Sequence, residues 1–239
     1  MEMCYLSTWH SIMYIFFNYV IDTHCAVGKS FLFRKNEFDH YGGFKAYSNY
    51  LAEDYFISQH YWKDGFRLGI APDSSFQNLG EISFSDYWTR QVRWTRIRYS
   101  VQPIPTFLEI FSMMVFNGLI SFYAFQRLFG IPPLVFAAFH LMIWFTTDVL
   151  FGLIFYLPSS FTITTFRYGL NSLRFSLSPK NDFSIFCYNI FRLLISWAAR
   201  EFLAIPLILH ACAGSSVVWR GKTFRIEKGS ALRDDQKLN

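Results

Sequence analysis

LAEDYF at residues 51–56 and RQVRW at residues 90–94 are the two runs around which the sequence is organised. The first places Glu53 and Asp54 at the start of a predicted helix, where the positive end of the helix dipole stabilises negative charge. The second places two guanidinium groups and an indole on one short amphipathic segment. Both runs precede residue 101, after which the sequence becomes strongly apolar, so they predict a polar working surface beside a membrane region.

The composition is unlike that of an average soluble protein. The 239 residues are 52% hydrophobic and only 16% charged, and the mean hydropathy is +0.20. Most of the charge, 27 of the 39 charged residues, falls in residues 25–100 and 219–239, whereas Phe, Leu, Ile and Ala dominate residues 101–218. This division predicts a peripheral part, a membrane part and a short basic tail.

The net charge of +5 could favour nucleic acid, but the basic residues cluster beside the apolar region without a compact nucleic-acid motif. We therefore expect no nucleic acid, and we favour anionic lipid headgroups and a nucleotide diphosphate as partners. The four cysteines form no CxxC pair, so neither a disulfide framework nor a zinc site is predicted. A reducing, cytosol-facing location fits, and the apolar run at residues 12–21 is not interpreted as a signal peptide.

The first hundred residues predict the second half of an α/β domain. Residues 1–24 are ambiguous between a strand, a buried helix and an interfacial helix. Beyond them the pattern predicts, in order, a buried strand at Gly28–Phe33, a short helix capped by Asn36 and ended by Gly42-Gly43, a helix from Asp54 to Lys63 ended by Gly65, and strands at Phe66–Ala71 and Ser74–Gln77 around a Pro72-Asp73 turn. Strand, helix, strand is the order found in α/β domains.

An amphipathic helix is predicted over Ser83–Ser100, ended by Pro103 and Pro105, and its Trp, Tyr and Arg content suits a headgroup layer. Three apolar segments long enough to span a bilayer follow, at Phe107–Leu128, Pro133–Tyr156 and Ile185–Ala211, with a loop at Ser159–Lys180.

Charged residues interrupt the apolar segments. Arg200 and Glu201 indicate a functional or interfacial helix rather than a lipid-facing one, because charge within a span is costly. The basic flanks favour an even number of crossings, with one segment re-entrant or lying flat.

Each short run also has a simpler interpretation. Glu53-Asp54 can be an acidic pair that stabilises a helix start, or Asp54 can be the base that takes a hydroxyl proton as the oxygen attacks an anomeric carbon. The Arg90–Trp94 run can be a membrane-surface helix, or its arginines can bind pyrophosphate while the indole stacks on a sugar or lipid. His40, His60 and Tyr61 are interpreted as packing or surface groups.

Residues 25–100 of the sequence, with a short run near the C-terminus, resemble the ceramide glucosyltransferase family. The resemblance rests on CAVGKSFLFRK at 25–35, GGF at 42–44, LAEDYF at 51–56, RQVRWT at 90–95 and, more weakly, WRG at 219–221. It implies transfer of glucose from UDP-glucose to the primary hydroxyl of ceramide, with inversion, by a multi-pass protein of the Golgi membrane whose catalytic part faces the cytosol. The implied fold is an incomplete A-type, Rossmann-like glycosyltransferase domain, followed by an interfacial helix and transmembrane helices.

The resemblance also implies roles for single residues. Asp54 matches the family's base, and Arg90, Arg93 and Trp94 match its (Q/R)xxRW element. Glu53 beside the base is expected to contact substrate. His10, within STWH at 7–10, is matched to a family histidine near the acceptor.

The chain departs from the family at its beginning. The family's N-terminal anchor and two earlier aspartate motifs, which hold the uridine nucleotide and a Mg or Mn ion, are not found, so the chain resembles the family's C-terminal portion. Residues 11–24 and 159–180 match poorly. The predicted division is an apolar segment at 1–24, half of a glycosyltransferase domain at 25–82, an interface helix at 83–100, a membrane region with two to three helices at 101–218 and a basic cytosolic tail at 219–239.

Two other functions compete with this interpretation. A processive polysaccharide synthase shares the acidic base and the arginine-tryptophan element, but it needs more spans to form a polymer channel. A catalytically inactive membrane scaffold that binds lipid or a full-length partner is favoured by the lack of the upstream aspartates. The sequence leaves oligomerisation open.

Overall fold

The computed structural model describes residues 1–26, 28–71, 80, 82–156, 182–219, 221–226 and 232–234, and only the backbone of 152–156, 182–190 and 232–234. These residues form two compact units that are each discontinuous in sequence. The first contains Met1–Ile12, Ala71–Ile82 and Phe111–Ala204, and the second contains Met13–Ile70, Ser83–Ile110 and Ile205–Asn239. Each unit is described by itself.

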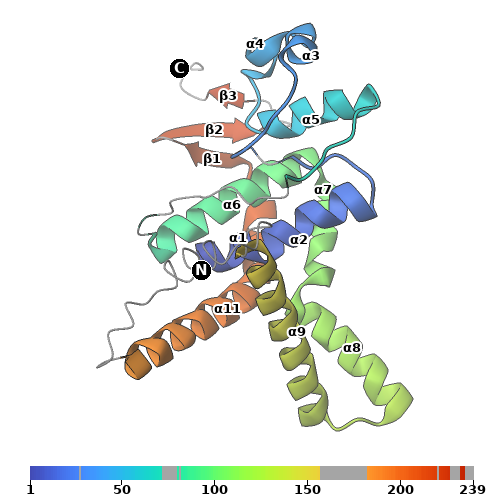
Figure 1. Cartoon of the computed structure of the whole chain (residues 1–239), viewed down its shortest axis with the longest axis vertical. Helices are drawn as coiled ribbons and strands as arrows, with labels where there is room; N and C mark the ends of the chain where they lie inside the picture. Colours follow the sequence, from blue (N-terminus) through green and yellow to red (C-terminus); the bar gives the residue numbers. More distant parts are fainter. Residues whose placement is uncertain are drawn as a thin grey trace, which may run out of the picture. The chain divides into compact units, whose positions relative to one another are not determined.

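The first unit is helical. It contains α1 (Glu2–Ser7), the start of α2 (Trp9–Ile15), α8 (Met114–Phe129), α9 (Pro133–Tyr156) and most of α11 (Asp182–Cys212). The ambiguous N-terminal segment is thus helical, continuing into a π-helical turn at Phe16–Val20 in the second unit. Helices α8 and α9 lie side by side as an antiparallel hairpin, which turns at Gly130 with a φ of +63° (Figure 1).

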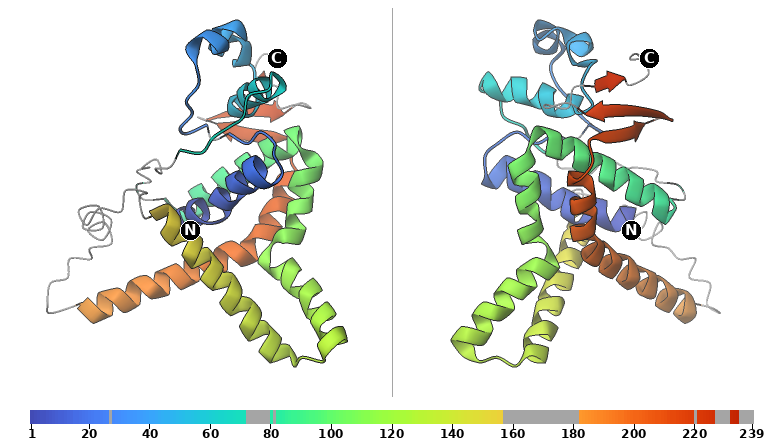
Figure 2. Two further views of the ribbon diagram at one scale, coloured as in Figure 1. Left: turned by 45° about the vertical axis from the view of Figure 1, so that its right-hand side comes forward. Right: turned by 180° about the vertical axis from the view of Figure 1, so that it is seen from behind.

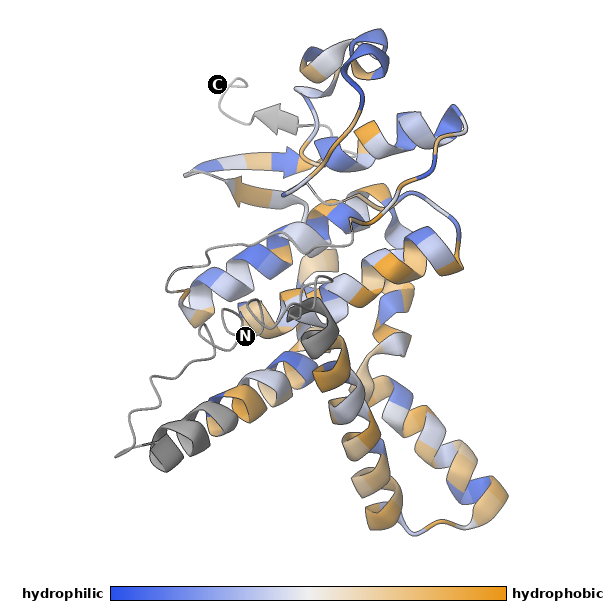
Figure 3. Ribbon diagram, viewed as in Figure 1, coloured by the Kyte–Doolittle hydropathy of each residue, from blue (hydrophilic) through white to orange (hydrophobic). Residues whose placement is uncertain are grey.

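Among the residues that the structure describes, two helices are long and apolar enough to cross a membrane, within Pro133–Phe151 and Phe191–Cys212. Orange residues accordingly dominate α8, α9 and the described part of α11, whereas blue residues are frequent in the shorter helices (Figure 3). The predicted segment Phe107–Leu128 is not one straight helix. Pro103–Ser112, which combines α7 (Pro103–Leu108) and a 3-10 turn (Glu109–Ser112), meets α8 at a bend of 58°, so the pair is a third span only if the bend is counted within it.

The second unit begins with short helices around an aromatic core. It contains α3 (Lys35–His40), α4 (Gly43–Tyr47) and α5 (Glu53–Lys63). Phe38, Tyr47, Ile57 and Tyr61 are buried together. The predicted helices at α3 and α5 are confirmed, as are their glycine ends, since Gly42 and Gly65 adopt φ values of +87° and +88°. The predicted cap is wrong, because α3 starts after Arg34 rather than Asn36.

The predicted strands at Gly28–Phe33 and Phe66–Ala71 are also wrong. Residues 28–33 and 66–71 form no strand, and Leu32 is 96% exposed. An apolar run becomes a strand only when a neighbouring strand pairs with its backbone N–H and C=O groups. The described part of residues 13–110 contains no strand that could pair with either run. The Ser74–Gln77 strand, the Pro72-Asp73 turn and the Ser159–Lys180 loop lie outside the described residues.

The amphipathic helix α6 (Phe84–Val101) confirms the prediction for residues 83–100. Ser83 caps it through a reciprocal capping box with Asp86, and Tyr87, Gln91, Val92 and Thr95 form the buried stripe. Pro103 ends α6 as predicted but also begins α7, because proline suits the first turn of a helix.

Helix α6 packs on the end of α11. Val92 is buried with Leu207 and Ala211. Arg96 donates to three main-chain carbonyl oxygens, those of His210 and Ala211 in the last turn of α11 and that of Ser216 just beyond it, at 3.0, 3.1 and 2.5 Å. These bonds join α6 to the last turn of α11 and to the segment that follows it. The helix that carries the RQVRW run is therefore fixed to the end of a candidate span.

The basic tail is partly a small antiparallel sheet. Its strands β1 (Ser216–Trp219), β2 (Lys222–Ile226) and β3 (Leu232–Asp234) follow in that order, with β1 and β2 joined at Gly221, whose φ is +77°. Val217 pairs with Phe224, and Phe224 with Asp234. Both views in Figure 2 show β1 directly after α11.

Replacing Gly214 should loosen the junction of α6 and α11. A Cβ at this position would overlap the Arg96 guanidinium. In Gly214→Ala this group must therefore move, and its hydrogen bonds to the three carbonyl oxygens are broken or weakened. We expect a loss of about 1–3 kcal/mol, the usual cost of unmaking hydrogen bonds to a charged group, seen as a lower Tm in detergent. Gly69→Ala is the matched control, because a Cβ there meets nothing within 4 Å. An equal Tm for the two variants would contradict the prediction.

Candidate functional site

Asp54 lies in the first turn of α5, where the main chain fixes both of its carboxylate oxygens. Oδ2 accepts a hydrogen bond from the Gly28 N–H and Oδ1 accepts one from the Tyr55 N–H, each at 2.8 Å. A Cβ on Gly28 would lie 2.8 Å from Oδ2, so only glycine allows this approach. The carboxylate is therefore held in one orientation by groups that do not move with side-chain rotamers.

Burial is the largest influence on Asp54. It raises the pKa of this carboxyl group above its ordinary value, although the two N–H donors oppose the shift. Partial desolvation, and then the nearby Asp54 charge, also raise the pKa of Glu53, whose side chain is more exposed. A carboxylate with a raised pKa is a stronger base than a solvated one, which suits it to accept a proton.

Buried hydrogen bonds of Ser58 and His24 fix the first turns of α5. The Ser58 hydroxyl donates to the Tyr55 carbonyl oxygen at 2.8 Å, so it must accept from Nδ1 of His24, which lies 3.2 Å away. The His24 ring also lies 4.7 Å from the Tyr55 ring, centroid to centroid. Burial and then the charge of Lys63 lower the pKa of His24, so the imidazole stays neutral at pH 7. Its contribution is to orient the first turn of α5.

The loop before Gly28 is fixed as firmly. Asn18 accepts from the Cys25 N–H at 2.9 Å and donates to the Cys25 carbonyl oxygen at 2.8 Å. Burial and then the charge of Asp54 raise the pKa of the Cys25 thiol to about 12, with Arg98 opposing. The thiol is protonated at neutral pH and is not a nucleophile. Cys4, Cys25 and Cys212 are free thiols.

Lys29, the next residue of this loop, reaches α6. Its Nζ lies 4.8 Å from the centroid of the Trp94 ring, and the Arg90 guanidinium carbon lies 5.9 Å from the same ring. Arg93 is partly buried, and this burial, followed by the charge of Arg90, lowers the pKa of its guanidinium. Three cationic side chains thus belong to one loop and one helix face, which suits them to bind a polyanion.

The predicted site residues are mostly brought together. Asp54 contacts Gly28 and Trp94 contacts Lys29, so the two runs meet on consecutive loop residues. Glu53, Arg90 and Arg93 belong to the same unit. His10 lies in the first unit, where its ring centroid is 5.4 Å from that of Tyr5.

Gly28 and Lys29 are the residues that sequence reasoning missed as site members. They begin the segment Gly28–Phe33, which the sequence predicts to be a buried strand, and side chains in such a strand are not expected to contribute to a site. A glycine followed by a lysine outside a strand is the signal that could have indicated them.

Comparison with known proteins supplies a family. The model described as Glycosyl transferase family 21 matches residues 1–232. Ceramide glucosyltransferase 1 of Caenorhabditis elegans is 24% identical over 97% of this chain and 44% of its own length. Ceramide glucosyltransferase of Komagataella phaffii is 28% identical over 93% of this chain and 51% of its own length. The chain spans about half the length of these curated relatives, and no solved structure matches it.

The opposite environments of Asp54 and Asp86 predict opposite effects of pH on stability. The pKa of Asp54 is raised by burial, so the folded state holds its proton longer than the unfolded state does. The free energy of unfolding of the protein should then fall, relative to Asp54→Asn, as the pH rises above about 3.9. Hydrogen bonds from Ser83 lower the pKa of Asp86, so the protein should lose stability relative to Asp86→Asn as the pH falls below that value.

The measurement is the Tm of the protein and both variants in detergent between pH 3 and 7. The two difference curves should slope in opposite directions. Parallel curves would show that Asp54 titrates like a solvated carboxylate.

Proposed function

The chain belongs to glycosyl transferase family 21, and from this premise we propose that the protein of which it forms all or part transfers glucose from UDP-glucose to the primary hydroxyl of ceramide. The observation that carries the proposal is the meeting of Asp54 and Trp94 on consecutive residues, Gly28 and Lys29. Relatives named ceramide glucosyltransferase over nearly the whole chain support the choice of acceptor and sugar.

Asp54 is the proposed base of a single displacement. The ceramide hydroxyl gives its proton to the Asp54 carboxylate while its oxygen forms a bond to the anomeric carbon of glucose. The bond from that carbon to the diphosphate oxygen breaks, and its electron pair leaves with UDP. One displacement inverts the anomeric centre. The N–H groups of Gly28 and Tyr55 support this role, because they hold the carboxylate before substrate arrives.

The cationic side chains are the proposed partners of the leaving group. Arg90, Arg93 and Lys29 would stabilise the charge that grows on the diphosphate, and the Trp94 indole would stack on the sugar or pack the lipid acceptor. Glu53, exposed beside the base, would accept hydrogen bonds from substrate hydroxyls. The family resemblance alone assigns His10 to the acceptor.

A divalent cation does not fit the described residues. They contain no group of three or more His, Cys, Asp or Glu side chains that could hold one. Among the residues that the structure describes, the cationic side chains of Lys29, Arg90 and Arg93 can offset the charge of the diphosphate.

The membrane setting follows from the apolar helices. We place the protein in the Golgi membrane as a multi-pass protein, with α5 and α6 on the cytosolic side, consistent with the basic residues that flank the spans. The donor domain would be A-type, with residues 25–82 as its C-terminal part. The three-stranded antiparallel sheet at the C-terminus does not supply the parallel sheet of such a domain.

The direct test uses membranes that carry this chain, incubated with UDP-glucose and fluorescent ceramide, beside membranes that carry any longer form encoded by its transcript. We expect glucosylceramide from the form that contains the nucleotide-binding motifs. If no form makes it, the inactive scaffold becomes the better proposal.

Asp54→Asn should lower turnover by about 10²–10⁴-fold in the active form, because the amide cannot take the hydroxyl proton. Membrane association should not change. Asp64→Asn, at the other end of α5, is the control and should keep full activity. Turnover retained by Asp54→Asn would remove Asp54 from the role of base.

Arg93→Ala should lower turnover by about 10–100-fold through loss of one charge-assisted hydrogen bond to the diphosphate. The exposed Arg34→Ala is the matched control. Normal kinetics for Arg93→Ala, with an unchanged Tm, would make α6 a membrane-surface helix and nothing more.

A further inference from the structure

Helix α7 has its apolar side on the outside of the second unit. Ile104, Phe107 and Leu108 are 71%, 47% and 53% exposed. Their spacing of three and four positions places them on one face of the helix. Thr106 and Ile110, by contrast, are buried. The outer face of this segment is therefore apolar and a polar side chain lies inside, which is the reverse of a helix that faces water.

Helix α6 buries its own apolar stripe within the protein. Val92 is packed with Leu207 and Ala211, and Tyr87 is buried as well. Between residues 84 and 110, the large apolar side chains that are exposed are Phe84, Ile104, Phe107 and Leu108. Three of these four belong to α7. The apolar surface that remains exposed in this part of the unit is therefore mainly that of α7.

The segment that contains α7 carries no unpaired charge. Glu109 is the only charged residue within residues 99–126, and it forms an ion pair with Arg98 of α6. Pro103 and Pro105 occupy two of the first three positions of α7. Because proline has no N–H group, these positions leave no donor that would lack a partner in an apolar medium. The α7 face can therefore lose its water at low cost.

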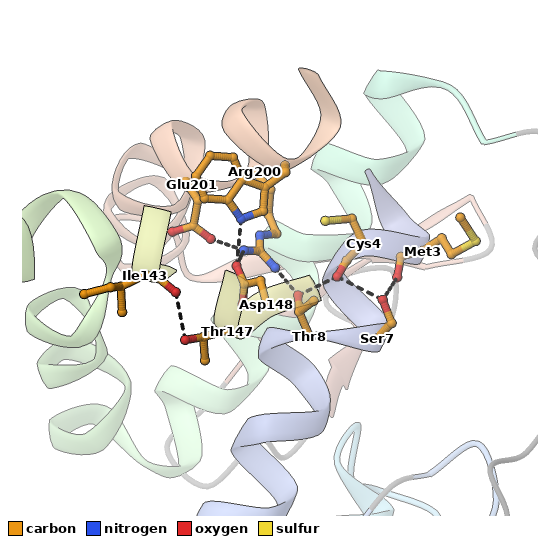
Figure 4. Close-up of polar contacts among 10 residues, drawn as sticks. Met3, Cys4, Ser7, Thr8, Ile143, Thr147, Asp148, Arg200 and Glu201 are labelled. Carbon is orange, nitrogen blue, oxygen red and sulfur yellow. Dashed lines mark hydrogen bonds and ion pairs between the residues drawn. The ribbon is translucent and has the colours of Figure 1, made fainter. Parts of the chain in front are cut away.

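The helices of the first unit treat charge in the same way. Asp148, Arg200 and Glu201 are buried, and Arg200 is paired with both carboxylates and with the Thr8 hydroxyl (Figure 4). The prediction that Arg200 and Glu201 do not face lipid is thus confirmed, as expected from the cost of placing charge in hydrocarbon. The apolar helices of this protein bury and pair their charged side chains and expose apolar ones, and α7 does the same.

The second unit contains the end of a candidate span. Residues 205–212 of α11 belong to this unit, and α6 packs on them. The end of a span lies at the bilayer surface, so a helix packed on that end lies near the surface too. Helix α7 follows α6 directly, and after a 3-10 turn the chain continues into the apolar α8. Hydrocarbon is therefore the apolar medium closest to the exposed face of α7.

We propose that Ile104, Phe107 and Leu108 form a docking surface for a phospholipid leaflet, with α7 lying along the membrane surface and its outer face in the hydrocarbon. The ion pair between Arg98 and Glu109 joins this surface to α6, which carries the RQVRW run. The docking surface thus holds that run at the leaflet. It goes beyond the proposed function and does not depend on the transfer reaction.

The test is photo-crosslinking of the full chain in phosphatidylcholine vesicles, with Phe107 replaced by the photoreactive residue benzoylphenylalanine. Irradiation should attach phosphatidylcholine to the α7 peptide, which mass spectrometry detects. The matched control is the same replacement of Phe44, which is 69% exposed on α4, a helix that Figures 1 and 2 show apart from α7. We expect about tenfold less lipid adduct at position 44, because only a side chain at the depth of the acyl chains meets them continuously.

A second variant removes the apolar character of the face. Leu108→Asp, combined with the photoreactive residue at position 107, should lower the yield of lipid adduct about fivefold, because a charge is costly in hydrocarbon. Leu32→Asp is the matched control, since Leu32 is an exposed leucine of the same unit outside α7. It should leave the yield unchanged. Both variants should keep the Tm of the unchanged protein in detergent, because both positions are exposed.

Three results would overturn the proposal. The lipid adduct at position 107 could be no more abundant than at position 44, the crosslink at position 107 could join a second copy of the chain instead of lipid, or Leu108→Asp could leave the yield unchanged. None of these measurements uses glucosyl transfer. A protein that makes no glucosylceramide would therefore refute the proposed function and leave the docking surface to be decided by the crosslinks.

Discussion

Polar groups buried among apolar helices must find their partners inside the protein, and this constraint organises both compact units. In the first unit, the Arg200 guanidinium is paired with Asp148, Glu201 and the Thr8 hydroxyl. In the second, Arg96 donates to two carbonyl oxygens in the last turn of α11 and to that of Ser216 in β1. An unpaired charge or carbonyl at either place would cost several kcal/mol, so these contacts select which helix ends and helix faces can pack.

The same constraint explains how a carboxylate can be kept ready for chemistry. Asp54 is desolvated enough to hold its proton more tightly, yet two main-chain N–H groups keep it oriented. Asn18 and His24 then fix the backbone on either side of the site, through Cys25 and through Ser58. Rigid supports of this kind are what a reacting group needs, since small displacements of a base cost large factors in rate.

Aromatic side chains replace a sheet as the core around α5. Phe33 and Phe38 lie 4.3 Å apart by ring centroids, and the Phe38 and Tyr47 rings are stacked at 6.0 Å. Each aromatic ring buries a large apolar surface even when it belongs to a loop or a short helix. Residues 28–33 are therefore held by ring packing, without pairing to another strand. Because Gly28 and Lys29 are not part of a strand, the Gly28 N–H is available to Asp54 and the Lys29 ammonium group reaches the Trp94 ring.

The sequence by itself determined the features that depend on nearby residues. The amphipathic pattern predicted α6, Gly65 the end of α5, and hydropathy the span of α9, because helix periodicity and helix ends depend on residues within a few positions. It also placed Asp54, Arg90, Arg93 and Trp94 in one functional proposal through family resemblance. It could not decide whether an apolar run such as 28–33 becomes a strand, since strand formation requires a partner elsewhere in the chain. Only the tertiary structure brought Gly28 to Asp54 across 26 positions and Thr8 to Arg200 across 192, because no local pattern records which buried donor will meet which distant acceptor.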